Sequence, residues 1–356
     1  MTVAIGLSGG VDSSVAALLL KQAGDDVSGV LMRLHPCPGS PSEQAGICRG
    51  ASQDEDIRAA EDVCARLSIP FRVIDCSRRF EDLVLRRVRE TYLAGTTPNP
   101  CVLCNPLIKF GVLPAAAGAA GLAFDRFATG HYAGLRRDAA TGRFLLERAA
   151  DRAKDQSYFL YRLGQAQLAT ALFPLGGLAK GRVRELAREA GLPIHDRKES
   201  QDFHDGSLAA LLGRPPREGD IVDRAGRVLG RHRGAWSYTV GQRHGLGVAH
   251  PVPLYVLATD VEENRVVVGP RSETFSAGCL VRDCVWGPFE TLAAPADVRV
   301  KVRSAGRPAA ATVSPLGADR ARVAFAEPVS AVAPGQSAVF YDGDTVLGGG
   351  VIEAAA

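Results

Sequence analysis

The chain has 356 residues, of which 46% are hydrophobic and 23% are charged, a balance typical of globular proteins. One hydrophobic core rarely serves so long a chain, so we expect two or three domains. The formal net charge of +3 excludes a basic field over the whole molecule, and an RNA site would therefore be a local patch.

The N-terminus and the cysteines indicate the cellular compartment. The chain runs directly into an apolar segment without a basic leader region, and no apolar run approaches the length of a membrane span. Eight cysteines in such a chain favour thiol chemistry in a reducing cytoplasm over a scaffold of disulfides. We expect a cytoplasmic protein with no membrane partner.

The first twenty residues predict a strand, a glycine turn and a helix. Residues 3–7 are a short apolar run typical of a buried strand, residues 8–10 are Ser-Gly-Gly, and residues 15–20 predict a helix. Glycines let the backbone approach an oxyanion closely, and a helix N-terminus presents free N–H groups with a partial positive charge. The turn is therefore a candidate phosphate site.

Two interpretations of this turn compete. The hydroxyls of Ser8, Ser13 and Ser14 can add donors to a phosphate site, and no Gly-Lys-Ser follows, so the turn is not a Walker A loop. An ordinary strand–helix turn capped by Asp12 or Ser13 would also fit a lone Ser-Gly-Gly. The full string SGGVDSS is more specific and favours the phosphate site.

Strands and helices alternate over the next stretch. Residues 27–34 and 71–75 predict strands, residues 54–67 and 80–94 predict helices, and residues 35–53, rich in Pro, Gly and Ser, predict a loop. The alternation predicts a doubly wound parallel sheet in an α/β fold, in which ligands bind beyond the carboxyl ends of the strands. The Ser-Gly-Gly turn lies at such an end.

Residues 96–105, TTPNPCVLCN, contain a C-x-x-C pair, Cys101 and Cys104. The prolines predict a loop rather than a regular helix or a central strand. A zinc site usually needs a second ligand pair, which the chain lacks. A redox dithiol, an iron–sulfur cluster with further ligands and plain loop cysteines remain as alternatives.

In the second half of the chain the predicted secondary structure changes from alternating strands and helices to mainly short strands. Residues 127–132 predict a strand end followed by a Gly-His turn, residues 154–160 a capped helix start, and residues 180–190 a charged helix. From about residue 220, short apolar runs separated by Gly, Pro and Asp predict small β-barrels. These runs are residues 219–223, 228–230, 254–257, 265–268 and 298–303, with two final strands within 334–341 and 348–352.

Seven strings in chain order resemble those of the tRNA-specific 2-thiouridylases, the MnmA family of the PP-loop ATP pyrophosphatase superfamily. They are GLSGGVDSS at 6–14, TTPNPCVLCN at 96–105 with IKF at 108–110, TGHYA at 129–133, KDQSYFLY at 154–161, ESQD at 199–202, TVGQRHGLG at 239–247, and PGQSAVFYDGD followed by VLGGGVI near the end. The resemblance covers nearly the whole chain. It implies a PP-loop domain over residues 1–204, a small central domain over 205–269 and a C-terminal β-barrel over 270–356.

The resemblance implies ATP-dependent 2-thiolation of the wobble uridine of tRNA. Adenylation turns the uracil O2 into a good leaving group, and sulfur then attacks C2. The target base must leave the anticodon stack, and Mg²⁺ would screen the phosphates. The implied catalytic residues are Cys104, Cys101 and Asp12, and the implied partners are the anticodon region of tRNA and a sulfur donor, such as a cysteine desulfurase or a sulfur relay protein.

The resemblance also implies two sets of binding residues. For ATP they are Gly6, Leu7, Ser8, Gly9, Gly10, Val11, Asp12, Ser13, Met32 and Gly130. For tRNA they are Asn99, Pro100, Cys101, His131, Lys154, Asp155, Gln156, Arg303, Ser304 and Gln336.

This chain departs from the family pattern at two places. Cys101 stands where many members have Asp. The family's second catalytic cysteine lies in a string like ESQDICFI, but residues 199–206 here are ESQDFHDG, so that His204 replaces the cysteine or a short deletion removes it.

Three alternatives follow for the sulfur step. Cys101 and Cys104 act alone, one carrying sulfur and the other closing a disulfide. Alternatively they hold an iron–sulfur cluster with Cys48, Cys37 or His204 as a third ligand. In the third alternative, sulfur transfer is lost and the chain is a divergent tRNA-binding paralogue or another PP-loop enzyme. Dependence of ATP turnover on tRNA would separate an RNA-modifying enzyme from a PP-loop enzyme that acts on a small molecule.

Overall fold

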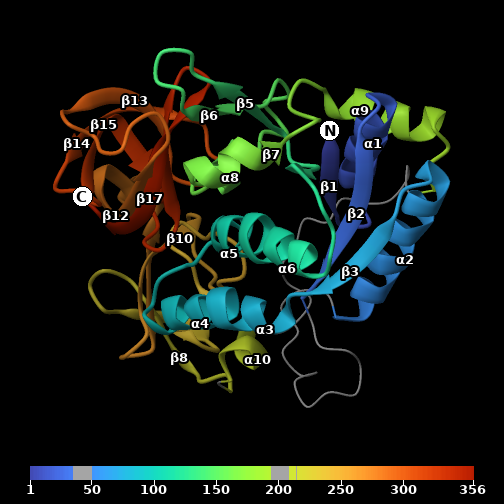
Figure 1. Ribbon diagram of the computed structural model, residues 1–356. Coiled ribbons are helices and arrows are strands. Elements are labelled where there is room, and N and C mark those ends of the chain that lie inside the picture. The colour runs from blue at the N-terminus through green and yellow to red at the C-terminus, as the bar shows by residue number, and fades with distance from the viewer. Residues whose placement is uncertain (35–49, 194–207, 214) are drawn as a thin grey trace. The chain divides into compact units, whose positions relative to one another are not determined.

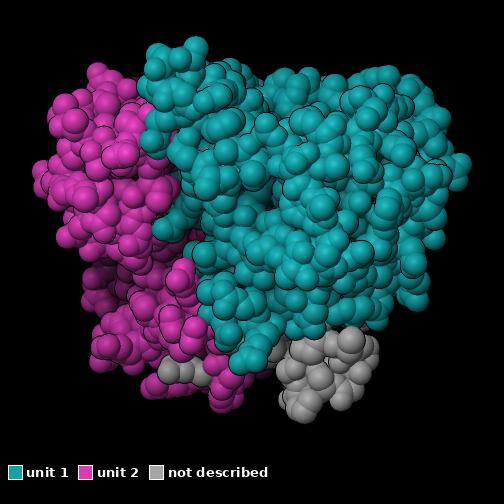
Figure 2. Space-filling model, viewed as in Figure 1, with its two compact units in different colours: residues 1–85, 101–207, 344–346 teal, residues 86–100, 208–343, 347–356 magenta. Residues whose placement is uncertain are grey.

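The computed structural model describes residues 1–34, 50–193, 208–213 and 215–356 (Figure 1). The chain divides into two compact units, coloured separately in Figure 2, and each is described by itself. Unit 1 comprises residues 1–85, 101–207 and 344–346, and unit 2 comprises residues 86–100, 208–343 and 347–356. The domain boundaries expected from the sequence stay predictions.

Unit 1 is built on a five-stranded parallel sheet, as the alternating pattern predicts. Its order is β3-β2-β1-β4-β7, and every adjacent pair is parallel. The strands are β1 (Thr2–Leu7), β2 (Asp26–Arg33), β3 (Phe71–Asp75), β4 (Arg126–Thr129) and β7 (Ala171–Leu172). The chain adds β2 and β3 on one side of β1 and then places β4 on the other, so the strand order reverses between β1 and β4. Ligands of doubly wound sheets bind at this point.

Helices connect the strands of unit 1, and Figure 1 shows α1 and α2 beside the sheet. The helical segments are α1 (Val11–Gln22), α2 (Gly50–Leu67), α3 (Ser77–Phe80), the π-helical η1 (Glu81–Leu85), α5 (Pro100–Cys104), the π-helical η2 (Asn105–Val112), α6 (Leu113–Ala119), α7 (Ser157–Leu160), α8 (Gln165–Thr170) and α9 (Lys180–Glu189). A hairpin that the sequence pattern does not indicate, β5 (Ala133–Arg137) with β6 (Phe144–Arg148), follows β4.

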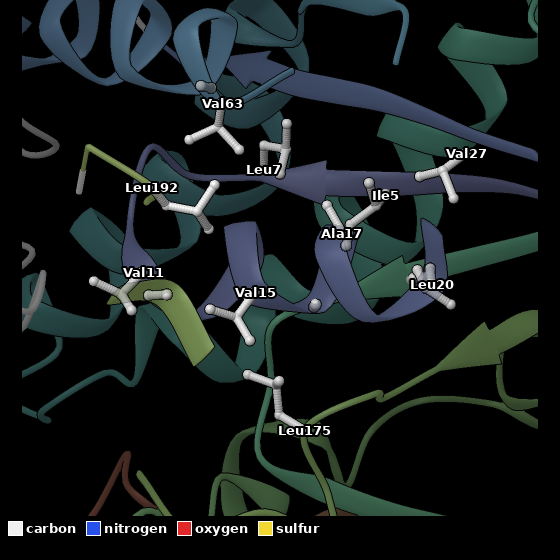
Figure 3. Packing of buried hydrophobic residues seen from close by; sticks show 14 of the residues in the cluster. Ile5, Leu7, Val11, Val15, Ala17, Leu20, Val27, Val63, Leu175 and Leu192 are labelled. Atoms are coloured by element: carbon white, nitrogen blue, oxygen red, sulfur yellow. The ribbon is translucent and has the colours of Figure 1, made fainter. Parts of the chain in front are cut away.

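A continuous apolar core fixes α1 against the sheet (Figure 3). Ile5 and Val15 are fully buried, and Leu175 and Leu192 pack into the same cluster from later in the chain. Burial of aliphatic side chains is the main stabilising term of such a layer. The core therefore holds the turn between β1 and α1 at a defined place.

The C-x-x-C pair lies in a helix, and the expectation of a loop was wrong. Pro100 occupies the first helical position of α5, where the missing N–H would have had no intrahelical partner and the proline φ fits the helix. Helical structure continues through η2 and α6 to Ala119. Pro100 therefore begins a helix instead of preventing one, and Pro98 lies just before it.

The same helical stretch, Pro100–Ala119, tests the expectation about membrane spans. Within the described ranges it is the one helix long and apolar enough to cross a membrane by length and composition, so the statement that no apolar run approaches that length was too strong. Val102, Ile108 and Leu113 on it are buried inside the protein, and a core helix passes the same test. One such helix is weak evidence for a membrane span.

Unit 2 consists mainly of two β structures, as the short apolar runs after about residue 220 predict. A four-stranded sheet has the order β10-β11-β8-β9, and a six-stranded antiparallel barrel has the order β12-β15-β14-β13-β16-β17, closed by pairing of β12 with β17. The strands are β8 (Gly219–Val222), β9 (Val228–His232), β10 (Leu254–Asp260), β11 (Arg265–Pro270), β12 (Phe275–Trp286), β13 (Ala296–Lys301), β14 (Ala309–Pro315), β15 (Ala321–Ser330), β16 (Ser337–Asp342) and β17 (Thr345–Ala355). The helical segments are α4 (Arg86–Leu93), α10 (Leu208–Leu212), η3 (Ala235–Ser237) and η4 (Arg271–Thr274).

Candidate active site

The phosphate turn follows β1 at the point where the strand order reverses. Gly9 has a φ of 68°, which only glycine adopts without strain, and Gly10 is the residue before α1. Among the described residues no side chain caps α1, so the helix N-terminus is suited to bind an anion. The geometry agrees with the predicted phosphate site.

The serine hydroxyls mostly organise the turn itself. Ser13 Oγ accepts the Ser8 N–H at 3.1 Å, and the two hydroxyl oxygens lie 3.2 Å apart. Ser14 is fully buried and donates to the Gly10 carbonyl at 2.9 Å. Ser14 therefore closes the turn from inside and does not add a donor for a ligand.

Asp12 in the first turn of α1 is held by a cation and a phenol. Lys180 Nζ lies 2.6 and 2.7 Å from its two carboxylate oxygens, and Tyr132 Oη donates to Oδ1 at 2.8 Å. The Asp12 side chain is 32% exposed and that of Lys180 is 11% exposed. An ammonium group thus lies beside the phosphate turn, where it can stabilise phosphate charge.

The turn after β4 packs directly against the phosphate turn. Gly6 of β1 is in register with Thr129 of β4. A Cβ at Gly130 would lie 2.5 Å from the backbone nitrogen of Ser13, so no other residue fits there without a shift of α1. Gly130 therefore lets two backbones meet at the predicted nucleotide site.

His131 links this turn to the C-x-x-C helix. Its Nδ1 lies 2.8 Å from Thr129 Oγ1, and its Nε2 lies 3.5 Å from Lys109 Nζ on η2. Because an ammonium group only donates, Nε2 accepts and Nδ1 carries the hydrogen. Burial, reinforced by the charge of Lys109, holds the pKa of His131 well below its usual value, so the imidazole is neutral. His131 is thus a buried structural link.

Cys101 and Cys104 are free thiols three residues apart on α5. Residues so spaced lie on the same helical face. Cys104 is only 4% exposed, and burial raises its pKa. Burial raises the pKa of Cys101 to about 12, while the charge of Lys109 lowers the pKa of both thiols. The resting pair is therefore protonated and lies near a cation that favours its ionised form.

Two residues of the KDQ motif, Asp155 and Gln156, make hydrogen bonds within unit 1. Asp155, with its side chain 1% exposed, accepts from the backbone N–H of Ala149 and from Ser157. Gln156 accepts the Tyr132 N–H at 2.9 Å. These bonds give the two residues positioning roles beside Tyr132. Their contact with tRNA, and that of the half-buried Lys154, remain predictions.

The remaining predicted tRNA residues lie in unit 2 or at its border. Arg303 and Ser304 are exposed in the turn after β13. Asn99 and Pro100 lead into α5, and Gln336 precedes β16. Gln336 Nε2 donates to the carbonyl oxygens of Thr97 and Pro98, both at 3.0 Å.

The remaining predicted site residues are Met32 and the candidate ligands of an iron–sulfur cluster. The Met32 carbonyl accepts from Gln53 Nε2 at 3.4 Å at the end of β2, beside β1. Cys37, Cys48 and His204, with the ESQD string, lie outside the described residues. Among the residues that are described, no group of three His, Cys, Asp or Glu side chains could hold a metal ion.

Sequence reasoning missed Lys180 as a site residue, although one signal was available. Lys180 is the first residue of α9, and a cation at a helix N-terminus opposes the helix dipole. Asp151 offsets this, because its carboxylate accepts the Lys180 N–H at 3.0 Å. A lysine at an unfavourable helix position indicates a function other than helix stability. Tyr132 and Lys109 lay inside strings that were noted, but no role was assigned to them.

Comparison with known proteins shows the family of the chain. Family models match the tRNA methyl transferase HUP domain over residues 1–204, the tRNA methyl transferase PRC-barrel domain over residues 211–270 and the Aminomethyltransferase beta-barrel domain over residues 276–352. A tRNA-specific 2-thiouridylase MnmA from Endomicrobium trichonymphae is 43% identical over 360 aligned positions, which cover 99% of each chain. The chain belongs to the tRNA-specific 2-thiouridylase family.

Other comparisons are consistent with this membership. A 2-thiouridylase of the same family from Synechococcus sp. is 45% identical, over 99% of this chain and 97% of that protein. A solved 4-thiouridine synthetase in complex with RNA and bound ATP has 19% identity and a TM-score of 0.37, covering 56% of this chain and 43% of that one. That structural likeness is too weak to carry an argument. The family resemblance and the fold class predicted from the sequence are confirmed.

Proposed function

We propose that this chain is a tRNA-uridine 2-sulfurtransferase that adenylates the wobble uridine with ATP and then replaces its C2 oxygen with sulfur. One observation in unit 1 carries the proposal. Gly130 abuts the phosphate turn, His131 next to it contacts Lys109, and Lys109 lies on the helical stretch that begins with the C-x-x-C pair. A nucleotide turn and a thiol pair are thus joined by consecutive contacts.

For the adenylation step, the residues of the phosphate turn fit an ATP site. The α1 N-terminus would bind phosphate oxygens, and Lys180 would stabilise the charge that develops as the uridine O2 attacks the α-phosphorus and diphosphate leaves. Asp12 and Tyr132 position the Lys180 ammonium group. Mg²⁺ would supply further charge neutralisation when bound with the phosphates.

For the sulfur step, the C-x-x-C pair fits a dithiol relay. A persulfide on one cysteine attacks C2, the C2–O bond breaks and AMP leaves. The second thiolate then attacks the cysteine sulfur bonded to the transferred atom, which releases 2-thiouridine and leaves a Cys101–Cys104 disulfide. A protein cysteine persulfide supplies the sulfur, and a dithiol reductant reopens the disulfide.

An iron–sulfur cluster on Cys101 and Cys104 remains the alternative for this step. Soft thiolates suit such a cluster, but it needs a further ligand, and Cys48 lies outside the described residues. Anaerobic purification distinguishes the two. A brown protein with absorbance near about 400 nm that Cys104→Ser bleaches would support the cluster. A colourless protein that thiolates tRNA from a persulfide donor would support the relay.

The proposed substrate is the anticodon region of tRNA, and the proposed compartment is the cytoplasm. Arg303 and Ser304 are exposed and could contact phosphates, while Asn99 and Pro100 precede the thiol pair in the chain. The experiment is nucleoside mass analysis of tRNA after incubation with the protein, ATP and a persulfide donor. We expect 2-thiouridine at the wobble position, together with AMP formation that requires tRNA. AMP formation at full rate without tRNA would instead favour a small-molecule PP-loop enzyme.

A further inference from the structure

Residues 95–100 form a strap in unit 2 that runs from α4 to the first residue of α5. The strap has no regular secondary structure before Pro100, and Pro98 within it is buried. Its conformation must therefore come from contacts with the rest of unit 2.

Two distant strings of unit 2 supply those contacts. The Thr97 N–H donates to the Pro334 carbonyl at 3.0 Å, and the Thr97 hydroxyl donates to Thr239 Oγ1 at 3.0 Å. Gln336 Nε2 donates to Thr97 O and Pro98 O. Both amide hydrogens of Gln336 are thus used on the strap backbone.

Gly335 allows the turn at residues 334–336 to approach the backbone of the strap closely. Its φ is 89°, and a Cβ there would lie 2.7 Å from Thr97 O and 2.8 Å from Thr97 N. Only glycine permits the turn to approach the strap at this distance. The Pro334-Gly335-Gln336 turn is therefore shaped to the strap backbone.

We propose that Gln336 is a positioning residue that fixes the strap and thereby the start of α5, which carries Cys101 and Cys104. The assignment differs from a direct contact between Gln336 and tRNA. Two hydrogen bonds on consecutive carbonyls, next to a glycine that admits the strap, restrain Pro98 and Asn99, and the chain then enters the helix at Pro100. Without these two hydrogen bonds the strap can adopt more conformations, and the first turn of α5 opens more often.

The decisive measurement is made on the full chain without tRNA. Iodoacetamide modification of Cys101, followed by peptide mass spectrometry, reports opening of the first turn of α5. In Gln336→Ala we expect the rate to rise about tenfold, since losing two hydrogen bonds of ordinary net strength favours local opening by that order. Gly335→Ala, which displaces the strap and leaves the amide in place, should raise the rate in the same direction.

A matched variant separates this effect from general loss of stability. Gln165 also makes two hydrogen bonds to a backbone, with Phe144 N and Phe144 O, both at 2.8 Å. Gln165→Ala should leave Cys101 modification at the wild-type rate. If Gly335→Ala does not fold, Thr239→Val removes one strap bond and gives a smaller rise.

Kinetics provide the second readout, which rests on the proposed function. In Gln336→Ala the single-turnover rate of thiolation should fall while the Kd for tRNA stays within about twofold. A weaker Kd with unchanged Cys101 modification would assign Gln336 to tRNA and overturn the inference, and so would unchanged modification in Gln336→Ala. A wild-type protein that makes no 2-thiouridine would overturn the proposed function alone, because the modification rate is measured without the reaction.

Discussion

The N-termini of two helices, α1 and α5, carry the proposed chemistry, and they are built in opposite ways. α1 begins after two glycines, and a partly exposed Asp12 holds Lys180 beside it. α5 begins at Pro100, and burial raises the pKa of both its thiols. The first terminus is organised for a charged ligand before the ligand arrives. At the second terminus burial favours the protonated thiols, and the charge of Lys109 opposes this by favouring the thiolates.

The largest expected effect is at the thiol helix. Cys101→Ala and Cys104→Ser should each lower 2-thiouridine formation by at least about a thousandfold, because both proposed mechanisms need two thiols and catalytic groups that act as a unit fail together. The measurement is nucleoside mass spectrometry after single turnover. AMP formation should continue, since the phosphate turn is intact. Full activity in Cys101→Ala would exclude both the relay and the cluster.

The second largest effect is expected at the phosphate turn, where a substitution should lower AMP formation itself. Lys180→Met should lower tRNA-dependent AMP formation by about a hundredfold or more, the usual cost of removing a group that stabilises transition-state charge. Asp12→Ala should act in the same direction because it releases Lys180. The Kd for tRNA, measured by filter binding, should stay nearly unchanged in both. An equal loss of tRNA affinity would show that this pair does not act on the phosphates.

The contrast between the two termini also explains what the sequence could predict. The strand, turn and helix at residues 3–20 followed from local apolar runs and glycines, and the structure confirms them. The helix at Cys101 did not follow, because prolines were taken to break a helix that Pro100 in fact begins. Lys180 and Asp12 are 168 residues apart, and only the packing of α9 against α1 brings them together. Such pairings depend on tertiary structure, and the position of Lys180 at a helix start does not indicate which residue it pairs with.

His131 joins the two regions, and its protonation offers a third, smaller test. The pKa of His131 is lower in the folded chain than in the unfolded chain. As the pH decreases below about 6.5, the unfolded chain therefore binds a proton that the folded chain does not bind, and the free energy of unfolding decreases. Between pH 7 and pH 5 the wild type should therefore lose more stability than His131→Gln, which has no imidazole to protonate. Urea denaturation at both pH values gives the difference. Parallel losses in the two proteins would show that the pKa of His131 is the same in the folded and the unfolded chain.

The smallest effect should come from a residue in neither region. Arg303 is exposed in unit 2, and as a single phosphate contact it should contribute about one unit to the slope of log K against log salt. Arg303→Ala should therefore weaken tRNA binding a few-fold and lower that slope, while Cys101 modification and tRNA-saturated AMP formation stay at wild-type rates. Arg320→Ala is the matched control, because Arg320 is also an exposed arginine of unit 2 but pairs with Glu353 at 2.5 Å. It should leave the slope unchanged, since an exposed ion pair of this kind adds little to stability and has no assigned phosphate. Equal slopes in the wild type and Arg303→Ala would remove Arg303 from the tRNA surface.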